Sequence, residues 1–245
     1  MPQISTLSKL RGGQSVMTAL KPAGNASPDL SRGEFFAGLF ALGCLSGLAL
    51  QIIQSVNRLG WANALFDTFE ISVIVWISCA AGISLVLQDR TIGIRPLELA
   101  IAAASVFLVI LPIGGLSWLA VTALSLYILY STKLDSSRRG ALILLATTVP
   151  MLWSRLLFRL FANPILQIDA SLVGWLLGTH RTGDMVEFAD GSGFLVVMPG
   201  CSSLTNVSLA FLCWVTISQL VRHKKTAYDL AWCLMACISI VAVNV

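Results

Sequence analysis

The sequence predicts an all-α polytopic membrane protein of about seven transmembrane helices, with an outer amphipathic helix and a short β-hairpin before Cys201. Of its 245 residues, 56% are hydrophobic and only 11% are charged, whereas soluble domains carry about 25% charged residues. Apolar runs long enough to cross a bilayer of roughly 30 Å as helices recur along the whole chain. Basic residues gather in alternate loops between these runs. Together these observations exclude an ordinary soluble domain.

The predicted spans follow directly from the apolar runs. They cover residues 34–54, 70–87, 97–114, 115–131, 141–161, 202–221 and 228–245. The third and fourth runs meet at Leu111-Pro-Ile-Gly-Gly-Leu116, a turn signal within a stretch too long for one span. We therefore expect two helices there, and a single re-entrant unit is the alternative.

The chain before the first span is predicted to be a disordered cytoplasmic tail over residues 1–32. It lacks the apolar core and cleavage site of a signal peptide, so the first span should act as an uncleaved anchor. Residues 33–139 then form a group of N-terminal transmembrane helices. We expect the remaining region, 140–245, to hold the functional residues.

Basic residues predict the orientation, because cytoplasmic loops of membrane proteins are enriched in lysine and arginine. A cytoplasmic N-terminus leaves only Arg58 and Arg181 in outer loops. It places inside the residues Lys9, Arg11, Lys21, Arg32, Arg90, Arg95, Lys133, Arg138, Arg139, Arg222, Lys224 and Lys225. The net charge of +4 is thus explained by topology and membrane lipid, and it gives no reason to expect a nucleic-acid partner.

The longest predicted outer segment, residues 162–200, is expected to contain two elements. Its first half has one apolar helical face and a polar one, as in a helix that lies on or dips into the membrane interface. The apolar face is formed by Ile165, Ile168, Leu172, Trp175 and Leu176, and the polar residues are Gln167, Asp169 and Ser171. The second half has the turn signal Asp190-Gly191 between two β-prone runs, which predicts a hairpin over 184–198. A plain connecting loop is the alternative.

Cys201 is the candidate nucleophile. It follows Pro199-Gly200, which interrupt any preceding element, so it should lie at or just before a helix N-terminus. The partial positive charge at such a terminus favours a thiolate. The other cysteines lie within apolar runs, where burial makes a thiol unreactive. Their spacing predicts no disulfide framework, metal site or cofactor.

Arg155 and Arg159 form a second candidate site near the outer end of the fifth span. Their spacing of four places both on one helical face. Arginines that face lipid at this depth are costly and often mark an interior site. One interpretation is a substrate-binding cationic pocket for an acidic group, and the other is that both side chains snorkel to the lipid headgroups.

The region 140–245 resembles the exosortase/archaeosortase family of membrane-embedded cysteine transpeptidases. The likeness lies in the order of Pro150, the amphipathic segment, the hairpin, and Cys201-Ser-x-Leu204 before an apolar helix. Ser203 stands where the family usually has glycine. In the family an arginine follows an asparagine near the end of a helix, as in Asn-Val-x-Arg, and a histidine follows a further helix. This sequence stops at Asn244-Val245, so by resemblance it ends before both.

The resemblance implies that 140–245 is an incomplete catalytic core of a bacterial inner-membrane enzyme. Its substrates would be exported proteins with a C-terminal sorting tail that contains a transmembrane helix. Cys201 would attack the tail on the outer face to form a thioester. Resolution by an amine or hydroxyl then gives transfer, and resolution by water gives proteolysis. The alternative is a non-enzymatic integral membrane protein, such as a transporter or an assembly factor, in which Cys201 is a packing residue.

Overall fold

The apolar runs of the sequence form helices in the computed structural model, which describes residues 30–111, 114–188, 190–198, 202–221 and 227–244. The N-terminal helical part comprises α1 (Arg32–Phe66), η1 (Thr68–Glu70), α2 (Val73–Val86), α3 (Pro96–Ile110), α4 (Gly114–Ser131) and α5 (Asp135–Thr148). The remainder comprises η2 (Val149–Trp153), α6 (Ser154–Leu177), β1 (Arg181–Thr182), β2 (Met185–Glu187), β3 (Phe194–Val196), α7 (Ser203–Leu220) and α8 (Ala227–Asn244).

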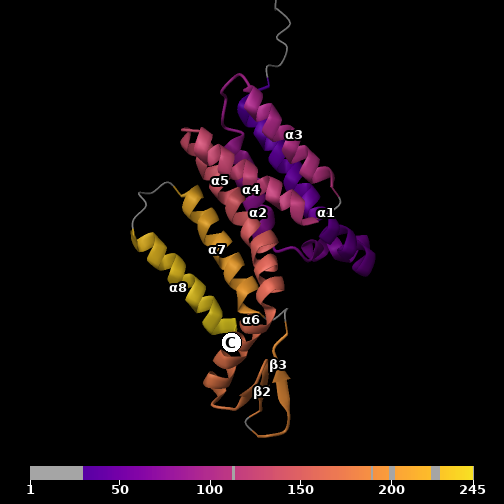
Figure 1. Cartoon of the computed structure of the whole chain (residues 1–245), viewed down its shortest axis with the longest axis vertical. Helices are drawn as coiled ribbons and strands as arrows, with labels where there is room; N and C mark the ends of the chain where they lie inside the picture. The colour runs from indigo at the N-terminus through magenta and orange to yellow at the C-terminus, as the bar shows by residue number, and fades with distance from the viewer. Residues whose placement is uncertain (1–29, 112–113, 189, 199–201, 222–226, 245) are drawn as a thin grey trace, which may run out of the picture.

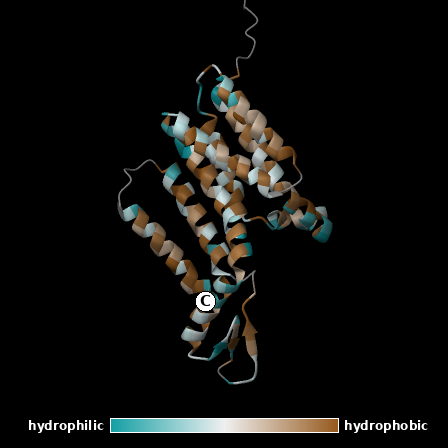
Figure 2. Cartoon of the chain, in the orientation of Figure 1, coloured by the Kyte–Doolittle hydropathy of each residue, from teal (hydrophilic) through white to brown (hydrophobic). Residues whose placement is uncertain are grey.

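Several of these helices have the character of membrane spans. By length and composition, three of the described helices could cross a membrane: Arg32–Phe66, the continuous helix Asp135–Leu177, and Ser203–Leu220. Shorter apolar helices cover Val73–Val86, Pro96–Ile110, Gly115–Ser131 and Tyr228–Asn244. Large apolar side chains point outward along them, as with Phe107, which is 65% exposed. Hydrophilic residues gather mainly at the helix ends (Figure 2). Extensive apolar exposure of this kind indicates a membrane protein.

The helices α1 to α5 and α7 lie together in a bundle, with α8 beside α7 (Figure 1). The second half of α6 and the strands project from one end of this bundle. The core between the helices contains Phe36, Phe40, Trp118 and Leu144. These side chains come from α1, α4 and α5, so the N-terminal helices share one core with the helix that leads into the projection.

The helices α2 and α5 approach closely where two glycines meet. A Cβ added at Gly140 would lie 2.6 Å from the carbonyl oxygen of Gly82, and one added at Gly82 would lie 2.6 Å from the Leu144 side chain. Small residues at a helix crossing let the two backbones approach, which is a common device in membrane proteins. Each glycine is therefore required by the space available.

A buried polar network closes the bundle end from which α1 starts. Arg32 donates to Glu98 at 2.7 Å and to the Ser131 hydroxyl at 2.9 Å, and it also bonds the Thr132 hydroxyl. Its guanidinium lies 3.4 Å from the carboxylate of Asp89. Both carboxylates are buried. One cation thus links α1, α3, the loop after α2 and the end of α4.

The start of α1 corrects the predicted boundary of the N-terminal tail. Residues 1–29 of that tail lie outside the described residues. Ser31 caps α1 by accepting the amide of Glu34, whose carboxylate accepts the amide of Ser31 in return. This reciprocal pair is a capping box, so Ser31 and Arg32 belong to the helix start rather than to the tail.

Two helices are longer than the sequence predicts. The first span was expected to end near residue 54, but α1 continues to Phe66 with a break at Gly60, where φ is +77°. Arg58, expected in an outer loop, therefore lies within a helix. The predicted amphipathic helix is continuous with the fifth span in α6, which bends at Phe161 instead of ending.

The predicted hairpin is confirmed, with one additional strand. β2 and β3 pair antiparallel, with Val186 opposite Leu195, and Gly191 in the connecting turn has φ of +68°. β1 pairs with the other edge of β2, so the sheet has the order β1-β2-β3. Val186 and Val197 pack on Leu166 and Ala170 of α6. The hairpin is thereby anchored on the projecting half of that helix.

Candidate functional site

The helix that follows Cys201 begins where the sequence predicts. Cys201 itself, with Pro199 and Gly200, lies outside the described residues. Ser202 is the N-cap of α7, and its hydroxyl accepts the amide of Leu204 at 3.3 Å. The cap is fully buried. Cys201 therefore immediately precedes a capped helix N-terminus in the sequence.

Asp169 holds the same helix N-terminus from the side of α6. Its carboxylate accepts the backbone amide of Ser203 at 3.1 Å, and the residue is only 6% exposed. Unsatisfied amides at the start of a helix attract a carboxylate. Asp169 was predicted to lie on the polar face of the amphipathic helix, but this partner was not predicted. The residue separation of 34 explains why.

The end of α8 reaches the same place. Asn244 donates to the Ser203 hydroxyl at 3.3 Å, and its side-chain oxygen accepts from Asn206 at 2.6 Å. The described part of α8 thus ends against the first turn of α7 (Figure 1). Side chains from α6, α7 and α8 meet at this N-terminus.

Arg155 and Arg159 line a cleft between α6 and the first helices. The cleft has a volume of about 710 Å³ and also contains Arg58, Glu70 and Gln51 in its lining. The Arg155 guanidinium donates to the side-chain oxygen of Gln51 at 3.0 Å. The two arginines share one face, as their spacing predicts. That face lines the cleft together with residues of α1 and η1.

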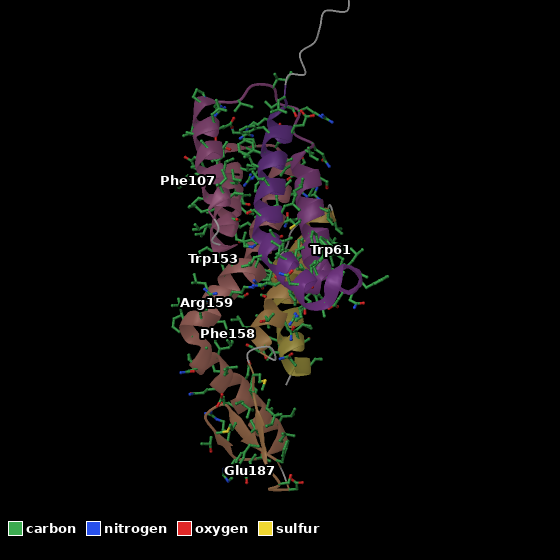
Figure 3. All side chains as sticks on the ribbon, turned by 90° about the vertical axis from the view of Figure 1, so that its right-hand side faces the viewer. Trp61, Phe107, Trp153, Phe158, Arg159 and Glu187 are labelled. Atoms are coloured by element: carbon green, nitrogen blue, oxygen red, sulfur yellow. The ribbon has the colours of Figure 1, made fainter. Side chains whose placement is uncertain are left out.

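A second hollow connects the arginine-lined cleft with α7. It has a volume of about 390 Å³ and shares Gln51, Glu70, Met151, Arg155 and Arg159 with the larger cleft. Thr205, in the first turn of α7, is also in its lining. The arginine pair therefore lies beside the helix start that follows Cys201. Figure 3 shows Arg159 on the stretch of α6 between the bundle and the sheet tip with Glu187.

An unusual turn places Glu70 in the cleft. Thr68, Phe69 and Glu70 have φ of 50°, 57° and 57°, a left-handed conformation that is uncommon for residues other than glycine. Thr68 stabilises the turn by donating its hydroxyl to the carbonyl of Ile71 at 2.7 Å. The Glu70 carboxylate pairs with Arg58, and its carbonyl accepts from Gln51 at 2.9 Å. No glycine marks this turn, so it could not be predicted from the sequence.

The cysteines other than Cys201 lie elsewhere in the fold. Cys44, Cys79 and Cys233 are buried in helices, and Cys213 and Cys237 are half-buried in helices. Within the described ranges, no cluster of three or more histidine, cysteine or acidic residues could hold a metal ion. The described residues thus assemble an arginine-lined cleft and a tightly held helix start. Comparison with protein-family models, curated proteins and solved structures finds no match to this chain.

Proposed function

We propose that this protein is an exosortase-like membrane cysteine protease or transpeptidase that cleaves C-terminal sorting tails of exported proteins through a thioester at Cys201. One observation carries the proposal: the helix that follows Cys201 starts at a buried cap, Ser202, and is held by the carboxylate of Asp169. A nucleophile needs a backbone held in place around it. A residue that only fills space does not require a helix start anchored by a buried charge.

The proposal includes seven membrane spans and a cytoplasmic N-terminus in a bacterial inner membrane. The end of the bundle that contains the Arg32 network would face the cytoplasm, and the sheet and the first turn of α7 would face outward. The alternating directions of the apolar helices support this arrangement (Figure 1). So does the presence of Arg90, Arg95 and Lys133 in the short connections next to that network, because basic residues favour the cytoplasmic side.

The chemistry proceeds in two acyl transfers. The Cys201 thiolate adds to the carbonyl carbon of the scissile peptide bond, the C–N bond breaks, and the leaving amine takes a proton from water. The hydroxide so formed accepts the proton of the nucleophile in the second transfer. The tail is released and the exported protein remains attached as a thioester. An amine or a hydroxyl then attacks the same carbonyl and displaces the thiolate, or water does so and the reaction is hydrolysis. Arg155 and Arg159 would bind an anionic group beside this site.

The test uses the full-length protein with an exported substrate that carries a tail, and it compares Cys201→Ala and Cys201→Ser with the wild type. We expect both variants to abolish tail cleavage while the protein remains inserted. A wild-type adduct that hydroxylamine releases would identify the thioester. Cys237→Ala is the matched control, because this half-buried cysteine of α8 lies within a helix. Its cleavage rate should equal that of the wild type.

Two outcomes would count against the proposal. Unchanged cleavage in Cys201→Ala excludes the thioester mechanism. If neither the wild type nor any variant processes a tailed substrate, the alternative of a transporter or an assembly factor gains support.

A further inference from the structure

We propose that the cleft lined by Arg58, Arg155 and Arg159 is a binding site for the phosphate headgroup of an anionic phospholipid. This inference names the anionic ligand of the arginine pair. It rests on the cleft alone and holds whether or not Cys201 cleaves a substrate.

The arginine pair of the cleft carries uncompensated positive charge. Glu70 pairs with Arg58. In the described part of the chain, no carboxylate pairs with Arg155 or Arg159. Among the described residues, the acceptor of a hydrogen bond from Arg155 is Gln51, which is neutral. Two like charges four residues apart on one helix face repel each other, and a bound anion would relieve this repulsion. Arginine also presents a planar fork that matches phosphate oxygens.

The lining of the cleft also changes from apolar to cationic along both of its walls. The α1 wall passes from Gly47 and Leu50 through Gln51 and Gln54 to Arg58. These positions recur every three or four residues, which is one face of a helix.

The opposite wall passes from Met151 and Leu152 through Arg155 and Leu156 to Arg159. Both helices run away from the end where α1 starts (Figure 1), so the two apolar parts face each other and the two cationic parts face each other. An amphiphile with an anionic head and an apolar chain matches this gradient. A soluble anion or the acidic side chain of a peptide would use only the cationic end.

Exposed tryptophans indicate the level of the cleft relative to the membrane. Trp61 and Trp153 are 72% and 39% exposed, and Figure 3 shows them at a similar height on the bundle. Exposed tryptophans concentrate at the headgroup level of a bilayer. Arg159 lies just beyond Trp153 along the helix (Figure 3). The cationic end of the cleft therefore lies where lipid phosphates are found.

The cationic end is also arranged before any ligand binds. The left-handed turn at Thr68 to Glu70 places the Glu70 carbonyl where Gln51 donates to it, at 2.9 Å. The same Gln51 accepts from Arg155 through its other atom. One amide thus links the strained turn to the arginine, and a headgroup would find the guanidinium already oriented. Preorganisation of this kind lowers the cost of binding.

The experiment is a lipid titration of the purified full chain in a non-ionic detergent, with bound lipids counted by native mass spectrometry. Phosphatidylglycerol is the probe and phosphatidylcholine is the zwitterionic comparison. Arg155→Gln with Arg159→Gln is the test variant. Arg181→Gln is the matched control, because Arg181 lies on β1 and bonds the carbonyls of Gln167 and Gly183 instead of lining the cleft.

We expect the wild type to prefer phosphatidylglycerol, and the double variant to bind it more weakly by about fivefold for each arginine lost. Arg181→Gln should bind like the wild type. If the double variant does not fold, the salt dependence of the wild type provides the test. The preference should fall as salt rises from about 0.1 M to about 1 M, because screening shortens the reach of the charges.

Three results would overturn the proposal. One is equal phosphatidylglycerol binding by the wild type and the double variant, or a preference that salt leaves unchanged. Another is soluble glycerol phosphate binding as tightly as the lipid, which would make the ligand a free phosphate. The third is an acidic peptide displacing phosphatidylglycerol from the arginines at equal concentration, which would make the ligand a substrate carboxylate.

Discussion

Replacing Gly140 by alanine should destabilise the protein even though alanine favours helices more than glycine does. The new Cβ would lie 2.6 Å from the Gly82 carbonyl oxygen, 2.9 Å from a methyl of Val86 and 3.0 Å from the Cβ of Leu85. The nearest atom belongs to the backbone of α2 and cannot rotate away, so the two helices must separate. Overpacking of this kind costs up to about 3 kcal/mol.

The gain in helix propensity offsets only about 1 kcal/mol of that cost. The net loss in the free energy of unfolding should therefore be about 2 kcal/mol. Gly38→Ala is the matched control, because a Cβ there meets nothing within 4 Å and should stabilise α1 by up to about 1 kcal/mol. Thermal unfolding in detergent, followed by circular dichroism, measures both variants. A Gly140→Ala protein that is as stable as Gly38→Ala would refute the close approach of α2 and α5.

Three further changes test separate parts of the fold. Arg32→Ala leaves two buried carboxylates without their cation and should lower the free energy of unfolding by about 3–5 kcal/mol in thermal or denaturant unfolding. Arg90→Ala, at an exposed ion pair, should lower it by less than about 1 kcal/mol. Similar losses in the two variants would contradict the network. Asp169→Ala should speed hydrogen exchange of the amides at the start of α7. Asp169→Asn, which keeps an acceptor, should restore most of the protection. Unchanged exchange in Asp169→Ala would show that the contact is unimportant. The hydroxyl and then the amide of Ser192 hold the pKa of Asp190 below its ordinary value, so Ser192→Ala should raise that pKa in an NMR titration. A lowered carboxyl pKa adds stability at pH values above the ordinary pKa, and this stability is lost as the pH falls. This variant should therefore also lose less stability on acidification, and an unchanged titration would show that the Ser192 hydroxyl is not the cause.

Local signals predicted most of the elements. Hydropathy placed most helices within a few residues, with α1 and the continuous helix Asp135–Leu177 as the exceptions. The turn signal at Leu111 to Leu116 separated α3 from α4 as expected. The Asp190-Gly191 signal predicted the β2–β3 hairpin, because a glycine with positive φ is needed there. These features depend on neighbouring residues, so a single sequence contains them.

Features that depend on distant partners could not be predicted. The spacing of Arg155 and Arg159 placed them on one face, but Arg58 and Glu70 come from elements about a hundred residues earlier. The buried role of Asp169 depends on an amide that the chain brings back only after the hairpin. The continuity of the fifth span with the amphipathic helix was also missed, because Pro164 lies inside α6 and the helix bends at Phe161 instead of ending there.

The network around Arg32 has a consequence for the order in which the growing chain assembles. Its partner Glu98 follows 66 residues later, and Thr132 follows 100 residues later. At a synthesis rate of about 5–20 residues per second, the guanidinium waits for roughly 5–20 s before its last partner exists. The first helix is therefore made well before the partners that hold its start. Lesions at the end of α4 should then appear during biogenesis as early helices that enter the membrane but remain open to quality-control proteases.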